Sequence, residues 1–232
     1  MVNSASAPNT RRRRQGIKAG LDLPQILSAA SAIAPDELTM QAVADRLGVD
    51  RKAVNHHVSD RETLLRLVAV DAYTRSFAAV SIPADCDWRE ASRIYGHGIA
   101  SAVIALGPLA RHVRVGASAD ALLLTVTEAV LARYVQAGFD LETGLRALSM
   151  LSDICEAYAH GVVGMAQDGA GKRDLWLREV LRDLPEQHPR YLGEAVESQI
   201  YTYDARQLEI SIEIYIRGVE ALTAEASPPL NE

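Results

Sequence analysis

The sequence predicts an all-α protein in which a small N-terminal unit of three helices precedes a larger helical domain. Three observations support this prediction. Apolar residues recur every three to four positions along most of the chain, helix-capping residues stand where these segments begin, and Gly or Pro stands where they end. The 232 residues are 48% hydrophobic and 23% charged, which excludes an intrinsically disordered chain and suits one large domain or two small ones.

The first unit follows an arm, residues 1–15, that has no apolar periodicity and that we expect to be disordered. We assign residues 16–66 to the unit itself. Asp22 can cap its first helix, because a short acidic side chain accepts hydrogen bonds from the free N–H groups of a first turn. Pro35 is expected to end that helix.

A second and a third helix are expected close together. Thr39 can cap the second helix, and Gly48 can take the left-handed conformation that a tight turn after it needs. Asp50 can cap the third helix, which should extend to about Val58. Residues 59–62 have the pattern of a capping box, which would begin a fourth helix.

The larger domain is assigned to residues 67–225, with a Pro-rich tail at 226–232 that we expect to be disordered. Its segments repeat the pattern of a cap, an apolar helix and a Gly or Pro stop. The fourth helix runs toward Val80, and later helices are expected at 88–106, 109–115, 119–136, 141–165, 174–184 and 203–224.

The last of these segments has two interpretations. Between Leu208 and Ile216 apolar residues alternate with polar or amphipathic ones, which alone indicates a strand. No second strong strand is available to pair with it, and an isolated strand is unstable. As a helix the segment is apolar on two sides, so it needs burial on two sides. Together with the long apolar helix at 141–165, it predicts a four-helix interface in a homodimer.

The net charge of −6 conceals an asymmetry. Residues 1–66 hold ten Lys and Arg against seven Asp and Glu, whereas the rest holds 14 against 23. A basic front and an acidic rear indicate a polyanion-binding end joined to a different kind of domain. We expect no membrane span and no secretory signal, because no apolar run is long enough. Cys86 and Cys155 form no close pair, which favours a reducing, cytoplasmic location.

The stretch from Leu38 to Val58 has the pattern of a helix-turn-helix, whose second helix can enter the DNA major groove. Arg51 and Asn55 lie four positions apart on its outward face and can bond guanine and adenine edges. The basic run Arg11 to Arg14 can reach the adjacent minor groove. The alternatives are a plain helical hairpin with a solvated charged face, and a solvated tail.

This stretch also resembles a known family. Leu38 to Leu65, with TMQAVADRLGVDRKAVNHHVSDRETLL at its centre, is similar to the DNA-binding domain of the tetracycline-repressor (TetR-like) transcriptional regulators. Val113 to Gly116 and Gln136 to Ser149 resemble the C-terminal domain of that family. The resemblance implies an all-α homodimer with an N-terminal DNA-binding domain and a C-terminal domain for ligand binding and dimerisation. It also implies that a small molecule lowers operator affinity.

The resemblance implies DNA contacts on and around the two helices of the motif. Family members often carry Tyr where Asn55 stands, so the operator sequence cannot be transferred. With the basic arm and the cap of the second helix included, the expected DNA-contacting residues are Arg11, Arg12, Arg13, Arg14, Thr39, Gln41, Arg51, Lys52, Asn55, His57 and Arg61.

The resemblance also implies an effector pocket in the C-terminal domain. Tetracycline-binding members hold a magnesium chelate through a histidine, and Arg114 stands at that place. A cation does not coordinate a metal, so we expect no metal, no cofactor, and a lipophilic effector with an acidic or carbonyl group. The expected pocket residues are Phe77, Tyr95, Ile99, Arg114, Thr127, Val130, Leu131, Tyr134, Ser149 and Ser152.

These features favour a ligand-responsive transcriptional regulator that binds a palindromic operator as a dimer, with repression as the family habit. An enzyme is not expected, because the chain has no Gly-rich phosphate loop, nucleophile elbow or close metal-ligand spacing. Two alternatives stay open. One is a DNA-binding regulator controlled by a protein partner, and the other is a helical small-molecule carrier or enzyme with an incidental N-terminal hairpin.

Overall fold

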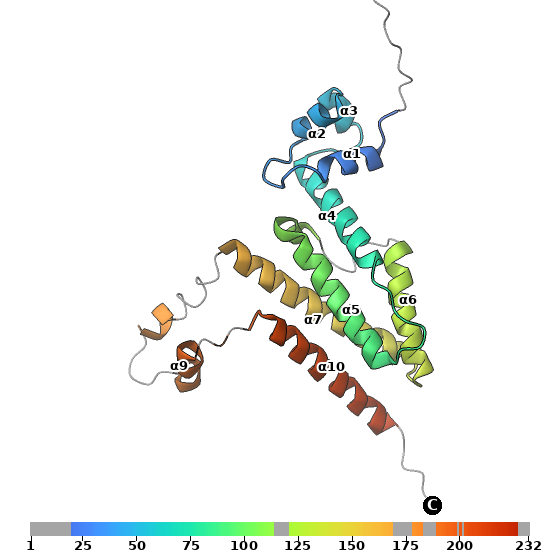
Figure 1. Ribbon diagram of the computed structural model, residues 1–232, viewed down its shortest axis with the longest axis vertical. Helices are drawn as coiled ribbons and strands as arrows, with labels where there is room; N and C mark the ends of the chain where they lie inside the picture. Colours follow the sequence, from blue (N-terminus) through green and yellow to red (C-terminus); the bar gives the residue numbers. More distant parts are fainter. Residues whose placement is uncertain are drawn as a thin grey trace, which may run out of the picture.

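The computed structural model describes residues 20–113, 121–168, 178–182, 189–198, 200 and 202–226. These residues form helices, turns and loops without a strand, so the all-α prediction is confirmed (Figure 1). None of the helices in the described ranges is long and apolar enough to cross a membrane. The chain begins with α1 (Leu23–Ala30), α2 (Met40–Leu47) and α3 (Arg51–Asn55), and α4 (Arg61–Ala78) leads from them into the larger domain.

The local signals at the first helices act as the sequence predicts. The Asp22 carboxylate accepts from the backbone N–H of Gln25, whose side chain in turn accepts from the Asp22 N–H. Thr39 caps α2 by accepting from the N–H of Ala42 at 3.1 Å. Gly48 ends α2 with φ +65°, in the left-handed region that a residue without Cβ adopts at no steric cost.

In the N-terminal unit, three boundaries differ from the predictions. α1 ends at Ala30 instead of continuing to Pro35, because the N–H of Ile33 turns back to the Ala30 carbonyl. α3 ends at Asn55, three residues before the expected limit. The capping box at 59–62 was a wrong prediction: Asp60 itself is the cap of α4, and its carboxylate accepts from the Thr63 N–H at 2.8 Å.

The N-terminal unit has a hydrophobic core of its own, to which α1, α2, α3 and the first half of α4 contribute. Its central members are fully buried and come from every one of these helices. Removing them from water supplies the main stabilisation of the unit, at roughly 25 cal/mol per Å² of apolar surface. They are Ile26, Ala30, Leu38, Val43, Ala44, Val54, Val58, Leu64, Leu65 and Val68.

The larger domain contains a second core, around which its helices pack. α5 and α7 lie against each other over much of their length, and α6 and α10 flank them (Figure 1). α9 was not predicted, has no buried residue and stands apart from the body in Figure 1. Residues 178–182 are also helical. The elements are α5 (Trp88–Ala105), the 3₁₀ helix η1 (Gly107–His112), α6 (Ala121–Gln136), α7 (Leu141–Asp168), α9 (Arg190–Glu197) and α10 (Ala205–Ala226).

The ambiguous segment between Leu208 and Ile216 is helical, as predicted, and belongs to α10. In a helix, Leu208, Ile212 and Tyr215 share one face, and all three are buried in the second core. Ile216 is buried as well, whereas Ile210 and Ile214 are exposed on the opposite side of α10. The strand-like alternation therefore comes from a helix with two apolar faces.

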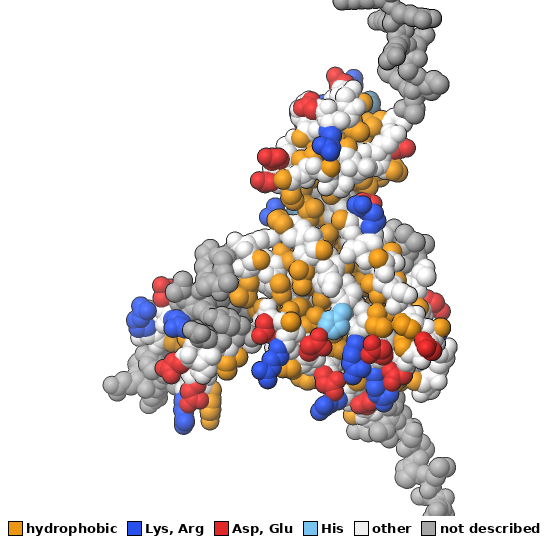
Figure 2. All heavy atoms as spheres, in the orientation of Figure 1, with side chains coloured by type: hydrophobic (Ala, Val, Ile, Leu, Met, Phe, Trp, Pro, Cys, Tyr) orange, Lys and Arg blue, Asp and Glu red, His pale blue; other side chains and the backbone are white. Residues whose placement is uncertain are grey.

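Paired charges align α10 against α5. Arg89 pairs with Glu220, the Arg93 guanidinium lies 3.3 Å from Glu213, and the His97 imidazole lies 3.1 Å from Glu209. Figure 2 shows blue and red side chains gathered over this lower part of the body. The partners are substantially exposed, so each pair contributes at most about 1 kcal/mol, and the pattern fixes alignment more than stability.

Candidate functional site

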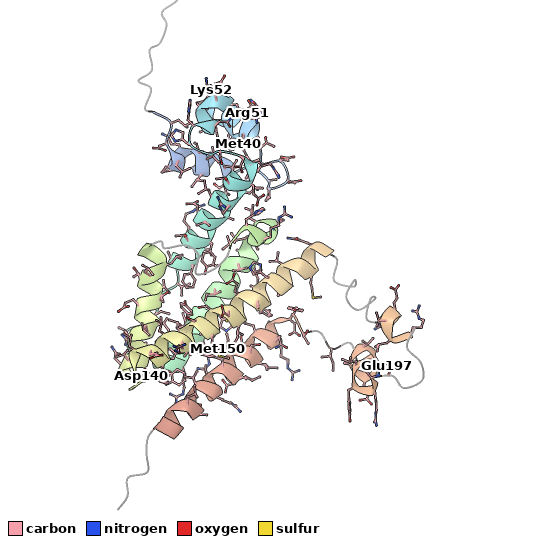
Figure 3. All side chains as sticks on the ribbon, turned by 180° about the vertical axis from the view of Figure 1, so that it is seen from behind. Met40, Arg51, Lys52, Asp140, Met150 and Glu197 are labelled. Carbon is pink, nitrogen blue, oxygen red and sulfur yellow. The ribbon has the colours of Figure 1, made fainter. Side chains whose placement is uncertain are left out.

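The outer end of the N-terminal unit presents the exposed face of α3. Val54 is 0% exposed and Val58 1% exposed, so these two side chains anchor α3 and the turn after it in the core. Arg51, Lys52 and Asn55 are exposed on the other side. Figure 3 shows Arg51 and Lys52 at the tip of the molecule, away from the larger domain. The side chains predicted to read DNA therefore lie together on an accessible surface.

The charge of this surface is available to a ligand. Within the described ranges, no carboxylate lies within ion-pair distance of Arg51 or Lys52. Asp50 caps α3 by accepting from the Lys52 N–H at 2.7 Å, which holds the start of the helix in place. A helix that projects unpaired cations and an amide suits the donor-and-acceptor pattern of a major groove.

The other residues predicted to contact DNA have different surroundings. His57 is exposed next to α3, and the exposed Thr39 uses its hydroxyl to cap α2. The Gln41 amide donates to Asp45 at 2.7 Å. Arg61 donates to the carbonyls of Leu38 at 2.7 Å and Pro35 at 3.1 Å. Its exposed guanidinium therefore braces the loop before α2. The four arginines Arg11 to Arg14 lie outside the described residues.

Most residues predicted to line an effector pocket converge inside the larger domain. Phe77 stacks on Tyr73 with ring centroids 5.7 Å apart and meets the edge of Tyr95 at 5.4 Å. Ile99 and Val130 belong to the same core and have no exposed surface. Leu131 is half-buried against this core. These side chains belong to the core of the larger domain or pack against it.

Besides Tyr134, three predicted residues carry polar groups in or beside this core. The Tyr95 hydroxyl lies 3.2 Å from that of Ser152, which also bonds the Leu148 carbonyl. Thr127 is half-buried and donates to the Leu123 carbonyl of its own helix. Ser152 and Tyr95 thus come together from α7 and α5, as a shared pocket requires.

Two predicted residues do not join this group. Ser149 is exposed on α7 and donates to the Leu145 carbonyl, so its side chain does not reach the core. Arg114 lies outside the described residues. Three surface hollows, at α1–α3, at the start of α5 and between α5 and α10, are lined by none of the ten predicted pocket residues.

Tyr134 takes part in a buried hydrogen-bonded chain that the sequence did not reveal. Ser92 donates to the Trp88 carbonyl at 2.7 Å, Tyr134 lies 2.6 Å from Ser92, and Tyr215 lies 2.6 Å from Tyr134. Burial raises the pKa of both phenols, so both stay protonated. No sequence signal identifies this chain, because its members lie on three helices far apart in sequence.

The junction of the two cores is formed by α4 and η1. Leu64, Leu65 and Val68 of α4 belong to the first core, whereas Ala69 begins the part of α4 that belongs to the second. Leu109 of η1 packs against both cores. One continuous helix therefore contributes to both cores.

A polar contact reinforces this junction. The His112 Nδ1 of η1 lies 2.8 Å from the Glu62 carboxylate in the first turn of α4, and the ring is largely buried. Arg111 donates to the other ring nitrogen at 3.1 Å, so that nitrogen accepts and Nδ1 carries the proton given to Glu62. No local signal in the sequence indicates this contact, because it joins residues 50 positions apart.

The described residues contain no cluster of three or more His, Cys, Asp or Glu side chains placed to hold a metal ion. Cys155 is buried, and burial raises the pKa of its thiol to about 12, so it remains a neutral core side chain.

Comparisons with known proteins show which fold this is. No family model and no curated protein matches the chain. Solved structures do match it. ActR from Streptomyces coelicolor, in complex with actinorhodin, is 23% identical with a TM-score of 0.71, over 90% of this chain and 100% of that one.

Two further structures give the same result. A possible TetR family transcriptional regulator from Streptomyces coelicolor A3(2) is 18% identical with a TM-score of 0.69, over 87% and 100% of the two chains. A TetR variant from Acinetobacter baumannii AYE, in complex with minocycline, is 17% identical with a TM-score of 0.59, over 87% and 98%. The chain therefore has the TetR-like fold that the sequence predicts.

Proposed function

We propose that the protein is a transcriptional regulator that binds a palindromic operator as a homodimer and releases it when a small molecule binds the larger domain. The observation that carries the proposal is the exposed face of α3, with unpaired Arg51 and Lys52 beside Asn55, at the far end of a helix that enters a separate core. Structures with this fold include ActR with actinorhodin and a TetR variant with minocycline.

The α3 face supports direct reading of base pairs. Arg51 can bond O6 and N7 of guanine, and Asn55 can bond N6 and N7 of adenine. Lys52 is suited to a phosphate, which positions the protein without selecting sequence. Arg61 braces the loop before α2 from the surface of the unit, and we propose that any phosphate contact it makes is secondary to this role.

Dimerisation would occur through α7 and α10. Figure 3 shows the two helices side by side on the rear face, with Met150 near the middle of α7. Exposed large apolar side chains lie on both: Leu141, Leu145 and Met150 on α7, and Ile210, Ile214 and Leu222 on α10. Two such pairs would form a four-helix interface that covers the apolar side chains facing away from the core, such as Met150 of α7 and Ile210 and Ile214 of α10.

Sedimentation velocity tests this interface. Ile214 is 66% exposed, so Ile214→Glu leaves the subunit fold intact but places a charge in the interface, and we expect a monomer at micromolar concentration. The matched control is Leu124→Glu on α6, where the replaced side chain is 59% exposed, and it should remain a dimer. Dimers from both variants would place the interface elsewhere.

Coupling between the sites would run through the junction of α4 and η1. An effector that separates the packed rings of Phe77 and Tyr95 must displace α4 or α5, since these helices hold them. Displacement of α4 changes the separation of the two α3 helices, which must lie about 34–36 Å apart to reach successive major grooves. A coupling free energy of about 1–3 kcal/mol would lower operator affinity roughly 5- to 150-fold.

Fluorescence anisotropy with duplex DNA tests the proposal. DNA from upstream of the protein's own gene is compared with a scrambled duplex across a salt series. We expect tighter binding to the upstream DNA and a steep salt dependence from phosphate contacts. Arg51→Ala should weaken specific binding by about 1–3 kcal/mol. The control is Arg75→Ala, which removes the same positive charge from an exposed position on α4. Loss of binding in both variants, or in neither, would refute the assignment of α3.

A regulator controlled by a protein partner is the second candidate. The burial of Phe77, Tyr95, Ile99 and Val130 favours it, because an effector could contact these side chains only after the core rearranges. The test adds a panel of lipophilic acids to the complex of the protein with its operator DNA. If none of them releases the DNA, the result favours control by a protein partner.

A further inference from the structure

A hollow of about 410 Å³ opens at the end of the larger domain where α5 begins and α6 ends. It is separate from the core residues predicted to bind an effector, none of which lines it. Its volume is at the lower end of the range for small-molecule sites, roughly 300–1,000 Å³. The residues that matter for its chemistry are Cys86, Asp87, Trp88, Arg89, Arg133, Gln136 and Phe139.

The two arginines on its wall differ in how their charge is balanced. Arg89 pairs with Glu220 and lies 3.7 Å from the Asp87 carboxylate, so its charge is neutralised. Arg133 has no carboxylate within ion-pair distance among the described residues. One of its terminal nitrogens donates to the Ala84 carbonyl, and its Nε is buried without an acceptor. Arg133 is therefore an uncompensated, half-buried cation at the edge of a hollow.

The cost of that arrangement indicates what the hollow would bind. A buried donor without an acceptor costs about 1–3 kcal/mol, and more when it is charged. A carboxylate relieves the cost, because its two oxygens match the fork of a guanidinium in a bidentate pair. A turn of the guanidinium about its side-chain bonds would bring Nε and a terminal nitrogen toward the same carboxylate.

The floor of the hollow is apolar and aromatic. Trp88 and Phe139 both line it, with ring centroids 5.1 Å apart in an edge-to-face contact. Tyr134 packs behind them, 5.2 Å from each ring. The Arg89 guanidinium already lies 4.8 Å over the Trp88 ring, so this floor offers the edges of the two rings, and not an open face, to an aromatic ligand. Gln136 adds a side-chain amide at the rim.

The thiol on the wall does not suit covalent chemistry. Burial raises the pKa of Cys86, and the positive charge of Arg133 only partly opposes this. The thiol remains protonated and donates to the Pro83 carbonyl at 3.2 Å. Because the thiolate is the reactive form, Cys86 is a neutral wall residue.

We propose that this hollow is a binding site for a small aromatic monocarboxylate, with the carboxylate on Arg133 and the ring on Trp88 and Phe139. A single uncompensated cation fits one negative charge, whereas a phosphate or dicarboxylate would bring a second charge next to Asp87. The site does not depend on DNA binding and is a second location, apart from the central core.

Fluorescence titration tests the site with benzoate as the probe. The chain has two tryptophans, so Trp176→Phe leaves Trp88 in the hollow as the only reporter. We expect a saturable change in Trp88 emission with benzoate and at least about tenfold weaker binding of benzamide, which has the same shape without charge. Equal affinity for benzoate and benzamide would overturn the proposal, and this result needs no variant of Arg133.

Variants locate the contact. In the Trp176→Phe background, Arg133→Gln should weaken benzoate binding by about tenfold or more and leave benzamide unchanged. Arg133→Lys should recover part of the loss, because it restores charge but not the fork. Arg75→Gln, remote on α4, should have no effect. Unchanged benzoate binding in Arg133→Gln would overturn the proposal. Since no DNA is present, this result is independent of whether the protein regulates transcription.

Discussion

The buried chain of hydroxyls at Tyr134 predicts an asymmetric response to the loss of single oxygen atoms. Ser92 has one proton and gives it to the Trp88 carbonyl, which can only accept. Tyr134 must therefore donate to Ser92, and Tyr215 must donate to Tyr134. The direction of donation makes Tyr134 the middle of the chain and Tyr215 its end.

The two Tyr→Phe substitutions should consequently differ in cost. Tyr134→Phe removes two hydrogen bonds and leaves the buried Tyr215 hydroxyl without an acceptor. It should lower the free energy of unfolding by about 2–4 kcal/mol. Tyr215→Phe removes one bond and leaves the bond from Tyr134 to Ser92 intact, so it should cost about 1 kcal/mol. The double variant should be no less stable than Tyr134→Phe, because it no longer buries an unpaired hydroxyl.

Urea unfolding followed by circular dichroism measures these differences. The protomer concentration is held constant, since dimerisation makes the midpoint concentration-dependent. The slope of the free energy of unfolding against urea concentration should be the same in all variants, so that differences in midpoint report differences in stability. An equal or larger loss for Tyr215→Phe than for Tyr134→Phe would refute the assigned direction of donation.

Two further predictions concern the N-terminal unit. Gly48→Ala places a Cβ on a residue in the left-handed region and should lower the free energy of unfolding by about 1–2 kcal/mol. Gly164→Ala is the control, because Gly164 has no positive φ and has open space around it, and it should not lower the stability. Thermal unfolding compares the two variants. Hydrogen bonds from Ser59 and Thr63 lower the pKa of Asp60. The ionised carboxylate therefore stabilises the folded protein fully at a pH above the ordinary Asp pKa. This stabilisation is lost as the pH falls through the lowered pKa of the folded state. NMR titration of the Asp60 carboxyl carbon should show the lowered pKa, and an ordinary pKa there would contradict the assigned cap.

Local signals in the sequence predicted the start of the fold well. Asp22, Thr39, Asp50 and Gly48 act through neighbours within a few residues, and each one caps or ends a helix as predicted. Boundaries without such a local signal were less accurate. The end of α3 depends on how Val54 and Val58 pack against other helices, and apolar periodicity continues past the point where the helix stops.

The candidate site divides in the same way. The exposure of Arg51 and Asn55 follows from helical periodicity once Val54 faces the core, so sequence alone could place them. The contact between Glu62 and His112 could not be found in this way, because it depends on the packing of two helices. The same is true of Arg133, whose Nε has no acceptor among the described residues, because this depends on how α6 packs.

Selection of bound duplexes from a random pool tests the central claim most directly. Repeated binding and amplification with the full-length protein should enrich an inverted repeat whose half-sites are centred about one helical turn, roughly 10 base pairs, apart. The same selection with Arg51→Ala should lose the preference at the base pair that Arg51 contacts. Enrichment of no common sequence, or of a single half-site without a repeat, would contradict a dimeric, sequence-reading regulator.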